Sequence, residues 1–346
     1  MLGQAENVLG GMRARAPRAA IVGIAGVVLL PEEQALFNAF PPAGVILFAR
    51  NVRDPGQLAA LVASLRAVLL PDADLMVDQE GGRVARLKPP HWHGHPPAAA
   101  LGRLFGSNPL AGLRAAWLTG ALIGHDCRSA GFTVAAAPVL DISVPGAHDV
   151  IGDRAFAGHP VDVARLGRAV ANGLLGAGIL PVGKHAPGHG RARVDSHLLL
   201  PRVAENDLSV DVRAFALNAD LPWIMTAHIV YDALDPHVPA TLSGTVIETV
   251  IRGRIGFKGV LVTDDLAMKA LSGIPAELAV QALAAGCDVA LYCSGDFAAT
   301  DALLRACPAL TPIAEQRLRT GREAAANRRL TLQPKLLSAE RDRLLA

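Results

Sequence analysis

Residues 159–185 read HPVDVARLGRAVANGLLGAGILPVGKH, and this stretch contains the repeating unit that decides the fold. Its first part, 159–178, has the spacing of apolar residues that is typical of a helix, and it closes with glycine, as many helices do. The apolar run GILPVG at 178–183 follows at once and leads into Lys184 and His185. A helix followed closely by a short buried strand indicates an α/β protein with a parallel sheet.

The same alternation continues along the chain. Eight apolar runs end in polar or glycine-rich clusters: AAIVGIAGVVLL (19–30), AGVILF (43–48), DLMV (74–77), FTVAAAPVLD (132–141), GILPVG (178–183), PWIMTAH (222–228), KGVLVTDD (258–265) and CDVALYCSG (287–295). Further helical patterns lie between them, at 54–69 and 276–286. Eight strand–helix units predict an α/β protein with a closed (β/α)8 barrel of the TIM type in a single domain. An open doubly wound sheet is the alternative, but its Gly-x-Gly-x-x-Gly turn is missing after the first run.

The domain organisation follows from these runs. We expect the catalytic barrel at residues 19–308, behind a flexible N-terminal tail at 1–18. The segment 309–346 alternates charged and apolar residues, which favours helices packed on the outside of the barrel with an arginine-rich solvated face. A basic lead before the run 19–30 imitates a signal peptide, but no small-x-small cleavage site follows it. We therefore interpret this run as the first buried strand and expect a cytoplasmic protein.

Composition excludes several kinds of partner. The formal net charge is +2 over 346 residues, which gives no electrostatic case for nucleic acid. The apolar run near the N-terminus is too short to span a bilayer, so no membrane partner is expected. The four cysteines have no CxxC spacing and are expected to be reduced thiols: Cys127, Cys287, Cys293 and Cys307. The expected partner is a small molecule, bound by a monomer or weak dimer.

Charged and histidine side chains stand at the ends of the predicted strands: Asp78, Asp141, Lys184, His185, His228, Asp264 and Asp265. The active site of a (β/α)8 barrel lies where the C-terminal ends of its strands meet, so these side chains are expected to share one cleft. Asp264, the first carboxylate after a buried strand, suits a nucleophile or a stabiliser of an electron-poor centre. The alternative is a solvated junction in which one of the two aspartates caps the next segment.

The segment VGKHAPGHGRARVDSHLLLP at 182–201 allows three interpretations: a metal site, an anion-binding loop or a mobile catalytic loop. Asp195 and His197 are two residues apart, so in an extended or turn segment the carboxylate can fix the imidazole tautomer and raise its basicity. A zinc site would need three or four convergent ligands, for which the candidates are His185, His189, His197 and His228. The metalloenzyme spacing HExxH is absent.

Two further segments offer ligand-binding side chains. DQEGGRVARL at 78–87 contains Asp78, Glu80 and Arg83 around a glycine pair that fits a tight turn. Asp78 comes first from the strand and is placed to accept hydrogen bonds from ligand hydroxyls. VIGDRAF at 150–156 puts Arg154 in a loop, where it is either a clamp for a hydroxyl or carboxylate or a surface ion pair.

With these motifs in order, the chain from Ile21 to Leu303 resembles the single-domain bacterial β-N-acetylglucosaminidases of glycoside hydrolase family 3. The motifs that carry the resemblance are GVILFARN, VDQEGGRVARL, APVLDI, VIGDRAF, KHAPGHGRARVDSH, MTAHIVYDALDPHVPATLS, GVLVTDDLAMKA and AGCDVAL. The specific part is KHxPGHG, followed at fixed spacing by DSH and later by TDDL.

The resemblance implies a retaining exo-β-N-acetylglucosaminidase that removes terminal non-reducing GlcNAc from peptidoglycan fragments, such as GlcNAc-1,6-anhydroMurNAc and its peptides, in cell-wall recycling. Asp264 would form the covalent glycosyl-enzyme, and His197, polarised by Asp195 on a mobile loop, would be the general acid/base. The residues that correspond to ligands of the sugar hydroxyls are Asp78, Arg154, Lys184 and His185. Asp141 matches a motif position without a clear role. No metal or other cofactor is implied.

The chain departs from the family pattern at the same loop. Ala186 stands where the family usually has Phe or Ile, and Arg191-Ala192 stand where many members have Asp-Thr. Arg191 and Arg193 either favour an anionic aglycone or solvate the loop. Three other functions remain open: phosphorolysis that gives GlcNAc-1-phosphate, a zinc-dependent barrel hydrolase, and a sugar-binding protein without turnover.

Overall fold

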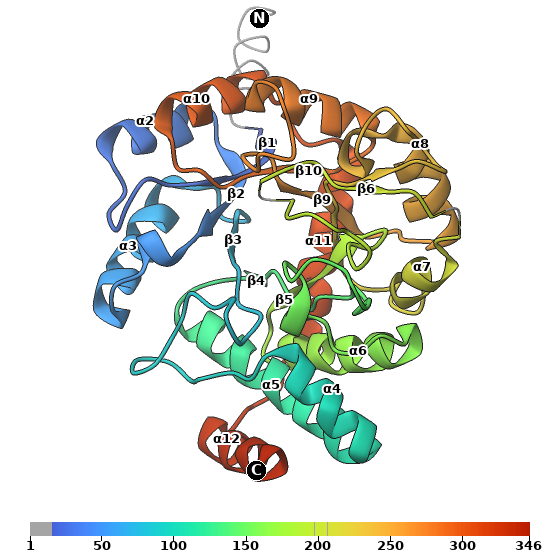
Figure 1. Ribbon diagram of the computed structural model, residues 1–346. Coiled ribbons are helices and arrows are strands. Elements are labelled where there is room, and N and C mark those ends of the chain that lie inside the picture. The colour runs from blue at the N-terminus through green and yellow to red at the C-terminus, as the bar shows by residue number, and fades with distance from the viewer. Residues whose placement is uncertain (1–15, 197, 206) are drawn as a thin grey trace, which may run out of the picture.

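Eight parallel strands close into a barrel in the computed structural model, which describes residues 16–196, 198–205 and 207–346. Around the barrel the order is β1-β10-β9-β7-β5-β4-β3-β2 (Figure 1). The strands are β1 (Arg18–Gly23), β2 (Pro42–Leu47), β3 (Asp74–Val77), β4 (Val134–Ala135), β5 (Leu180–Ala186), β7 (Trp223–Thr226), β9 (Val260–Asp265) and β10 (Val289–Tyr292). Each predicted apolar run contains or overlaps one of them, so the predicted single-domain TIM-type barrel is confirmed.

Helices surround the barrel on the outside (Figure 1). They are α2 (Pro31–Ala39), α3 (Pro55–Val68), α4 (Ala98–Ser107), α5 (Pro109–Ser129), α6 (Pro160–Gly176), α7 (Ser209–Ala216), α8 (Gly244–Val246) with the π-helix η4 (Ile247–Arg254), α9 (Pro275–Ala285) and α10 (Phe297–Ala306). The helices predicted at 54–69, 159–178 and 276–286 correspond to α3, α6 and α9. Gly286 ends α9 at φ 118°, a left-handed conformation that glycine adopts without steric cost.

The first strand is shorter than its apolar run. β1 ends at Gly23, whereas the run continues to Leu30. The side-chain amide of Asn51 donates to the carbonyls of Ile24 and Gly26, at 3.1 and 2.8 Å. The backbone beyond Gly23 therefore bonds to a side chain instead of a neighbouring strand, and the ladder ends there.

Helix α11 (Pro312–Asn327) covers the N-terminal end of the barrel. Its buried Ala314 and Leu318 share a core cluster with residues of the barrel strands. Arg317 donates to Asp288 at 2.7 Å and Arg322 to Asp74 at 2.8 Å, and these aspartates stand where β10 and β3 begin. Part of the arginine-rich face is therefore bound to the barrel and not solvated, and α12 (Pro334–Leu345) packs against α5 (Figure 1).

All four cysteines are buried and free. Burial raises the pKa of the Cys307 thiol to about 12, so it stays protonated near neutral pH. Within the described ranges, no helix is both long and apolar enough to cross a bilayer.

A two-stranded parallel sheet lies beside the barrel and follows the loop after β5. β6 (Arg202–Val203) pairs with β8 (Val230–Tyr231), and Val230 N also donates to the carbonyl of Pro201 at 3.0 Å. The loop that carries Asp195 is thereby held at its C-terminal end next to the barrel mouth.

Candidate active site

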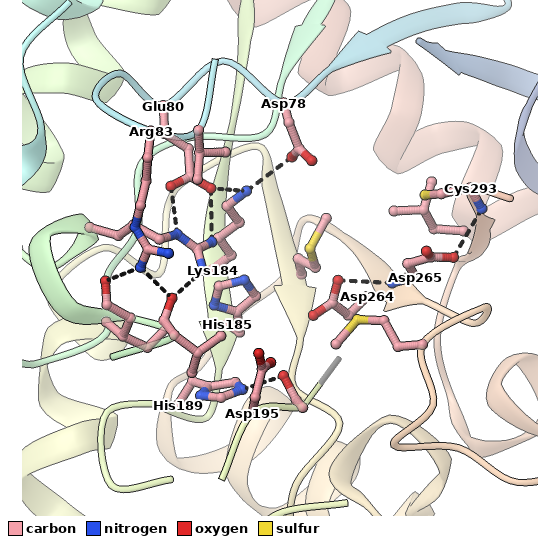
Figure 2. A pocket seen from close by; sticks show the side chains of 18 of the residues that line it. Asp78, Glu80, Arg83, Lys184, His185, His189, Asp195, Asp264, Asp265 and Cys293 are labelled. Carbon is pink, nitrogen blue, oxygen red and sulfur yellow. Dashed lines mark hydrogen bonds and ion pairs between the residues drawn. The ribbon is translucent and has the colours of Figure 1, made fainter. Parts of the chain in front are cut away.

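A pocket of about 570 Å³ opens at the C-terminal ends of the barrel strands. Figure 2 shows several of its side chains directed toward one space. The predicted site residues that line it are Asp78, Arg154, Lys184, His185, Asp195 and Asp264. The remaining one, His197, lies outside the described residues. The structure therefore brings together side chains from five segments of the chain. Asp141 and His228, which were also expected in this cleft, do not line the pocket.

A buried ionic cluster forms one wall of the pocket. Lys184 Nζ donates to Glu80 Oε1 at 2.6 Å and to Asp78 Oδ1 at 3.1 Å. Arg154 binds the two oxygens of Glu80 through Nε and Nη2, at 2.8 and 2.9 Å (Figure 2). Burial by itself would raise the pKa of Glu80, but Arg154 and Lys184 outweigh it and hold the pKa well below its usual range. Sequence reasoning noted Glu80 but assigned it no role.

The turn after β3 places Arg86, which sequence reasoning missed, beside Asp78. The buried Gln79 side chain accepts from the backbone N–H groups of Arg86 and Leu87 and donates to the Leu87 carbonyl. This folds the turn back, so that Arg86 Nη2 reaches Asp78 Oδ2 at 3.1 Å. Its guanidinium also lies over the Phe48 ring, 5.4 Å from the centroid. The only signal in the sequence was the spacing of Arg86 from Asp78 across a glycine turn.

Arg83 has a different task from its neighbour Arg86. Its Nη2 donates to the carbonyls of Asp149 and Val150 at 2.7 and 2.9 Å, and its Nε binds Asp153. Arg154 Nη1 donates to the same Val150 carbonyl at 3.1 Å. Arg83 therefore holds the loop that presents Arg154 to the pocket.

The two adjacent aspartates at the end of β9 have separate roles. Asp265 turns toward β10, where its Oδ1 accepts from Cys293 N and from Ala267 N, both at 2.9 Å. Both aspartates line the pocket, and the carboxylate of Asp264 accepts from Asp265 N at 2.8 Å (Figure 2). Asp265 is therefore the aspartate that caps the following turn, and Asp264 is the one available for chemistry.

The environment of Asp264 keeps it ionised. Burial by itself would raise the pKa of this carboxyl, but the electrostatic effects of His185 and His228, the Asp265 N–H and Lys184 lower it to about 2. Near neutral pH the pocket therefore holds a carboxylate without its proton, which is the state that a nucleophile or an electrostatic stabiliser requires.

Asp141 is buried, and its carboxylate accepts hydrogen bonds from two histidine residues. Its Oδ2 accepts from His185 Nδ1 at 2.7 Å, and its Oδ1 accepts from the backbone N–H of His189 at 2.7 Å. The bond to Nδ1 fixes the imidazole of His185 and leaves its Nε2 for the pocket. Asp141, whose role the sequence did not define, thus orients His185 and the start of the loop after β5.

The geometry does not favour a zinc site. His228 engages both ring nitrogens, Nδ1 with Thr241 Oγ1 at 2.8 Å and Nε2 with the Asp265 carbonyl at 2.9 Å. His185 uses Nδ1 on Asp141, as described above. In the part of the chain that the structure describes, no group of three or more His, Cys, Asp or Glu side chains is placed to hold a metal ion.

The loop after β5 is fastened on its outer side. Arg191 Nε donates to Asp211 Oδ2 of α7 at 2.7 Å, and Asp211 is buried. On the barrel side, Tyr231 donates its hydroxyl to the Gly188 carbonyl at 2.7 Å. Arg193, by contrast, is exposed. The ion pair identifies Arg191 as an anchor of the loop, and neither of the two roles expected from the sequence describes it.

Comparison with known proteins is consistent with this geometry. Residues 30–327 match the family model described as the glycosyl hydrolase family 3 N terminal domain. A beta-hexosaminidase of Aromatoleum aromaticum is 37% identical over 325 residues, which cover 91% of this chain and 90% of the relative. A beta-hexosaminidase of Methylococcus capsulatus is 41% identical over 273 residues, 77% of this chain and 80% of the relative.

Solved structures give the same result. NagZ from Neisseria gonorrhoeae in complex with N-trifluoroacetyl-D-glucosamine superposes with a TM-score of 0.84 at 30% identity, covering 95% of this chain and 97% of that one. A family 3 beta-N-acetylglucosaminidase from Paenibacillus sp. str. FPU-7 has a TM-score of 0.80 at 32% identity, covering 96% of this chain and 68% of that one.

Proposed function

This chain belongs to glycoside hydrolase family 3 and is a glycoside hydrolase of the β-N-acetylhexosaminidase type, and from that premise we propose that it is a retaining exo-β-N-acetylglucosaminidase. The observation that carries the proposal is the ionised Asp264 in the same pocket as the cluster of Asp78, Lys184 and Arg154. A retaining glycosidase needs a carboxylate on one side of the anomeric carbon and a proton donor on the other.

In the proposed first step, Asp264 attacks the anomeric carbon of a terminal GlcNAc. The C–O bond to the aglycone breaks, and the leaving oxygen takes a proton from His197, which Asp195 orients and polarises. In the second step, His197 takes a proton from water, and the water oxygen displaces Asp264. Asp195 lies in the pocket wall, on the loop that precedes position 197, which supports this assignment.

We propose that Asp78 and the cations of the ionic cluster, together with the neighbouring His185, bind the sugar. Asp78, with a partly exposed carboxylate, and His185, with Nε2 directed away from Asp141, are placed to bind sugar hydroxyls. Lys184 and Arg154 are already bound to Glu80, and we assign them the remaining N–H groups as donors. Arg86 joins this set because it shares Asp78 with Lys184.

The natural substrates we propose are peptidoglycan fragments, GlcNAc-1,6-anhydroMurNAc and its peptides, degraded in the cytoplasm during cell-wall recycling. A muramic acid carries a carboxylate on its lactyl group. An imidazole acid/base does not repel this anion, whereas a second catalytic carboxylate would.

The same electrostatics would admit a second acceptor of the glycosyl group. Phosphate is also an anion, and an imidazole base admits it as the acceptor of the glycosyl group, which would give GlcNAc-1-phosphate. Incubation of the glycosyl-enzyme in water and in phosphate buffer, with both products quantified, separates hydrolysis from phosphorolysis.

The deciding experiment is a trap of the intermediate. A 5-fluoro-GlcNAc glycosyl fluoride should glycosylate Asp264 alone, with loss of the anomeric fluoride, and should add the mass of one fluorinated sugar residue to the peptide that contains Asp264, read by mass spectrometry. The matched control is Asp264→Asn, which should remain unlabelled. Label on a different residue, or turnover of an aryl β-GlcNAc by Asp264→Ala near the wild-type rate, would overturn the assignment.

A further inference from the structure

A buried hydrogen bond spans the loop that carries Asp195. His189 Nε2 lies 2.9 Å from Ser196 Oγ, and both residues are only 2% exposed. Ser196 follows Asp195 directly and precedes position 197, while His189 stands near the start of the loop, close to the end of β5. The bond therefore joins the base of the loop to the segment on which the proposed proton donor depends.

The protonation state of the His189 ring sets the direction of this bond. Burial lowers the pKa of His189 to about 4, and the neighbouring His185 adds to the effect, so the imidazole is neutral near pH 7. Its Nδ1 is buried and has no hydrogen-bond partner among the described residues. A buried N–H without an acceptor is rarer in proteins than a bare acceptor. The proton therefore belongs on Nε2, which donates to Ser196 Oγ.

The backbone of His189 is bonded to Asp141, which also binds the proposed sugar ligand His185. The His189 backbone N–H donates to Asp141 Oδ1 at 2.7 Å, and Asp141 Oδ2 accepts from His185 Nδ1 at 2.7 Å. The rings of His185 and His189 meet edge to face, with centroids 5.6 Å apart. Figure 2 shows His189 beside Asp195. A continuous set of contacts thus runs from His185 through Asp141 and His189 to Ser196.

We propose that His189 is a positioning residue, whose bond to Ser196 fixes Asp195 in the pocket wall and so supports proton transfer to the aglycone. The inference rests on the proposed function. General acid–base catalysis contributes about 10²–10⁴-fold to a rate, and a displacement of about 1 Å can cost about 10²-fold. Loss of the bond should therefore slow the step that needs a proton and spare the attack by Asp264.

Leaving groups of different acidity separate these two effects. With a dinitrophenyl β-GlcNAc, the leaving group departs without a proton, so kcat/KM reports the attack by Asp264 alone. With a phenyl β-GlcNAc, the leaving group needs a proton, so kcat/KM also reports the proton donor. For His189→Leu and Ser196→Ala we expect losses of about 30-fold or more with the phenyl substrate, and about threefold or less with the dinitrophenyl substrate. His189→Gln, whose amide nitrogen can occupy the place of Nε2, should recover most of the phenyl activity.

The matched control is Arg193→Ala, which changes an exposed side chain in the same loop. It should leave kcat/KM for both substrates unchanged. Circular dichroism identifies any variant that fails to fold, and Ser196→Ala removes so little volume that it keeps the test available. Equal losses on both substrates, or full phenyl activity in Ser196→Ala, would overturn the positioning role. If the wild type turns over neither substrate and Asp264 takes no label, the proposed function itself fails.

Discussion

Glu80 and Lys184 form an ion pair of 2.6 Å in the wall of the pocket, and the same carboxylate binds Arg154 through both oxygens. Side-chain exposure is 7% for Glu80 and 3% for Lys184. Two cations can occupy this buried wall because one carboxylate lies between them. Glu80 therefore stabilises the side chains that we propose as sugar ligands without being placed as a ligand itself.

Replacement of Glu80 by Gln should damage both stability and substrate binding. Removal of one partner from a buried ion pair typically costs about 3–5 kcal/mol, and Asp78 compensates Lys184 only in part. We expect KM for an aryl β-GlcNAc to rise by at least about tenfold, because Arg154 and Lys184 lose their orientation. Steady-state kinetics and urea unfolding measure the two effects.

The control for this prediction is Glu323→Gln, which makes the same chemical change on an exposed position of α11. It should change neither KM nor the unfolding midpoint. A Glu80→Gln variant with wild-type KM would show that the cluster does not orient the sugar ligands.

The adjacent aspartates should respond differently to substitution. Asp264→Asn should lose about 10⁴-fold or more in kcat, since an amide cannot form the glycosyl-enzyme. Asp265→Asn should retain most of kcat and most of the stability, because the amide oxygen can still accept from both Cys293 N and Ala267 N, which bind Oδ1. Kinetics together with thermal unfolding distinguish the two variants. The same loss of kcat in both would contradict the separation of roles.

The lowered pKa of Asp264 predicts how stability depends on pH. The folded-state pKa of about 2 lies below the ordinary aspartate value of 3.8, so the contribution of this carboxylate is fully present above about pH 4. It is lost as the pH falls through the folded-state pKa, and it amounts to an order of 2 kcal/mol. Between pH 5 and pH 2, urea unfolding of the wild type should therefore lose more free energy than that of Asp264→Asn. Parallel curves would contradict the pKa shift.

Arg191→Met should destabilise the protein in a pH-dependent way. The pKa of Asp211 is raised because burial outweighs its pairing with Arg191, and loss of the arginine should raise it further. A raised folded-state pKa gives stability that is present at low pH and lost as the pH rises through that value. Arg191→Met should therefore be closest to the wild type near pH 4 and weakest near pH 8, as thermal unfolding measures.

The double variant Arg191→Met with Asp211→Asn tests the cause. It should recover much of the stability at pH 8, because it removes the unpaired buried charge. Arg193→Met is the matched control on an exposed position and should show no pH-dependent loss. A pH-independent effect of Arg191→Met would mean that the pair does not govern the anchor.

Local patterns in the sequence were sufficient to predict the barrel and the residues on its upper edge. Strand and helix periodicity identified each of the eight strands, and the position of Asp78, Lys184, His185 and Asp264 at strand ends predicted a common pocket. The length of β1 could not be predicted, because the side chain of Asn51, from a later segment, takes the carbonyls that would have continued the ladder.

The residues that the sequence did not assign are those whose role depends on the path of a turn or on a partner in another loop. Arg86 and Arg83 are three positions apart in the same turn, yet the first meets Asp78 and the second the carbonyls of Asp149 and Val150. No periodicity distinguishes them, because the Gln79 side chain sets the path of the turn.

By itself, the sequence determined which segments form strands, in what order they follow, and which side chains stand at their ends, because these features depend on hydrophobic spacing along the chain. Only the tertiary structure decided that Asp265 caps a turn while Asp264 stays available in the pocket, that Glu80 joins Lys184 to Arg154, and that Arg191 is an anchor on Asp211. The physical reason is that these roles arise from burial and charge between residues far apart in the chain, which become neighbours only when the barrel closes.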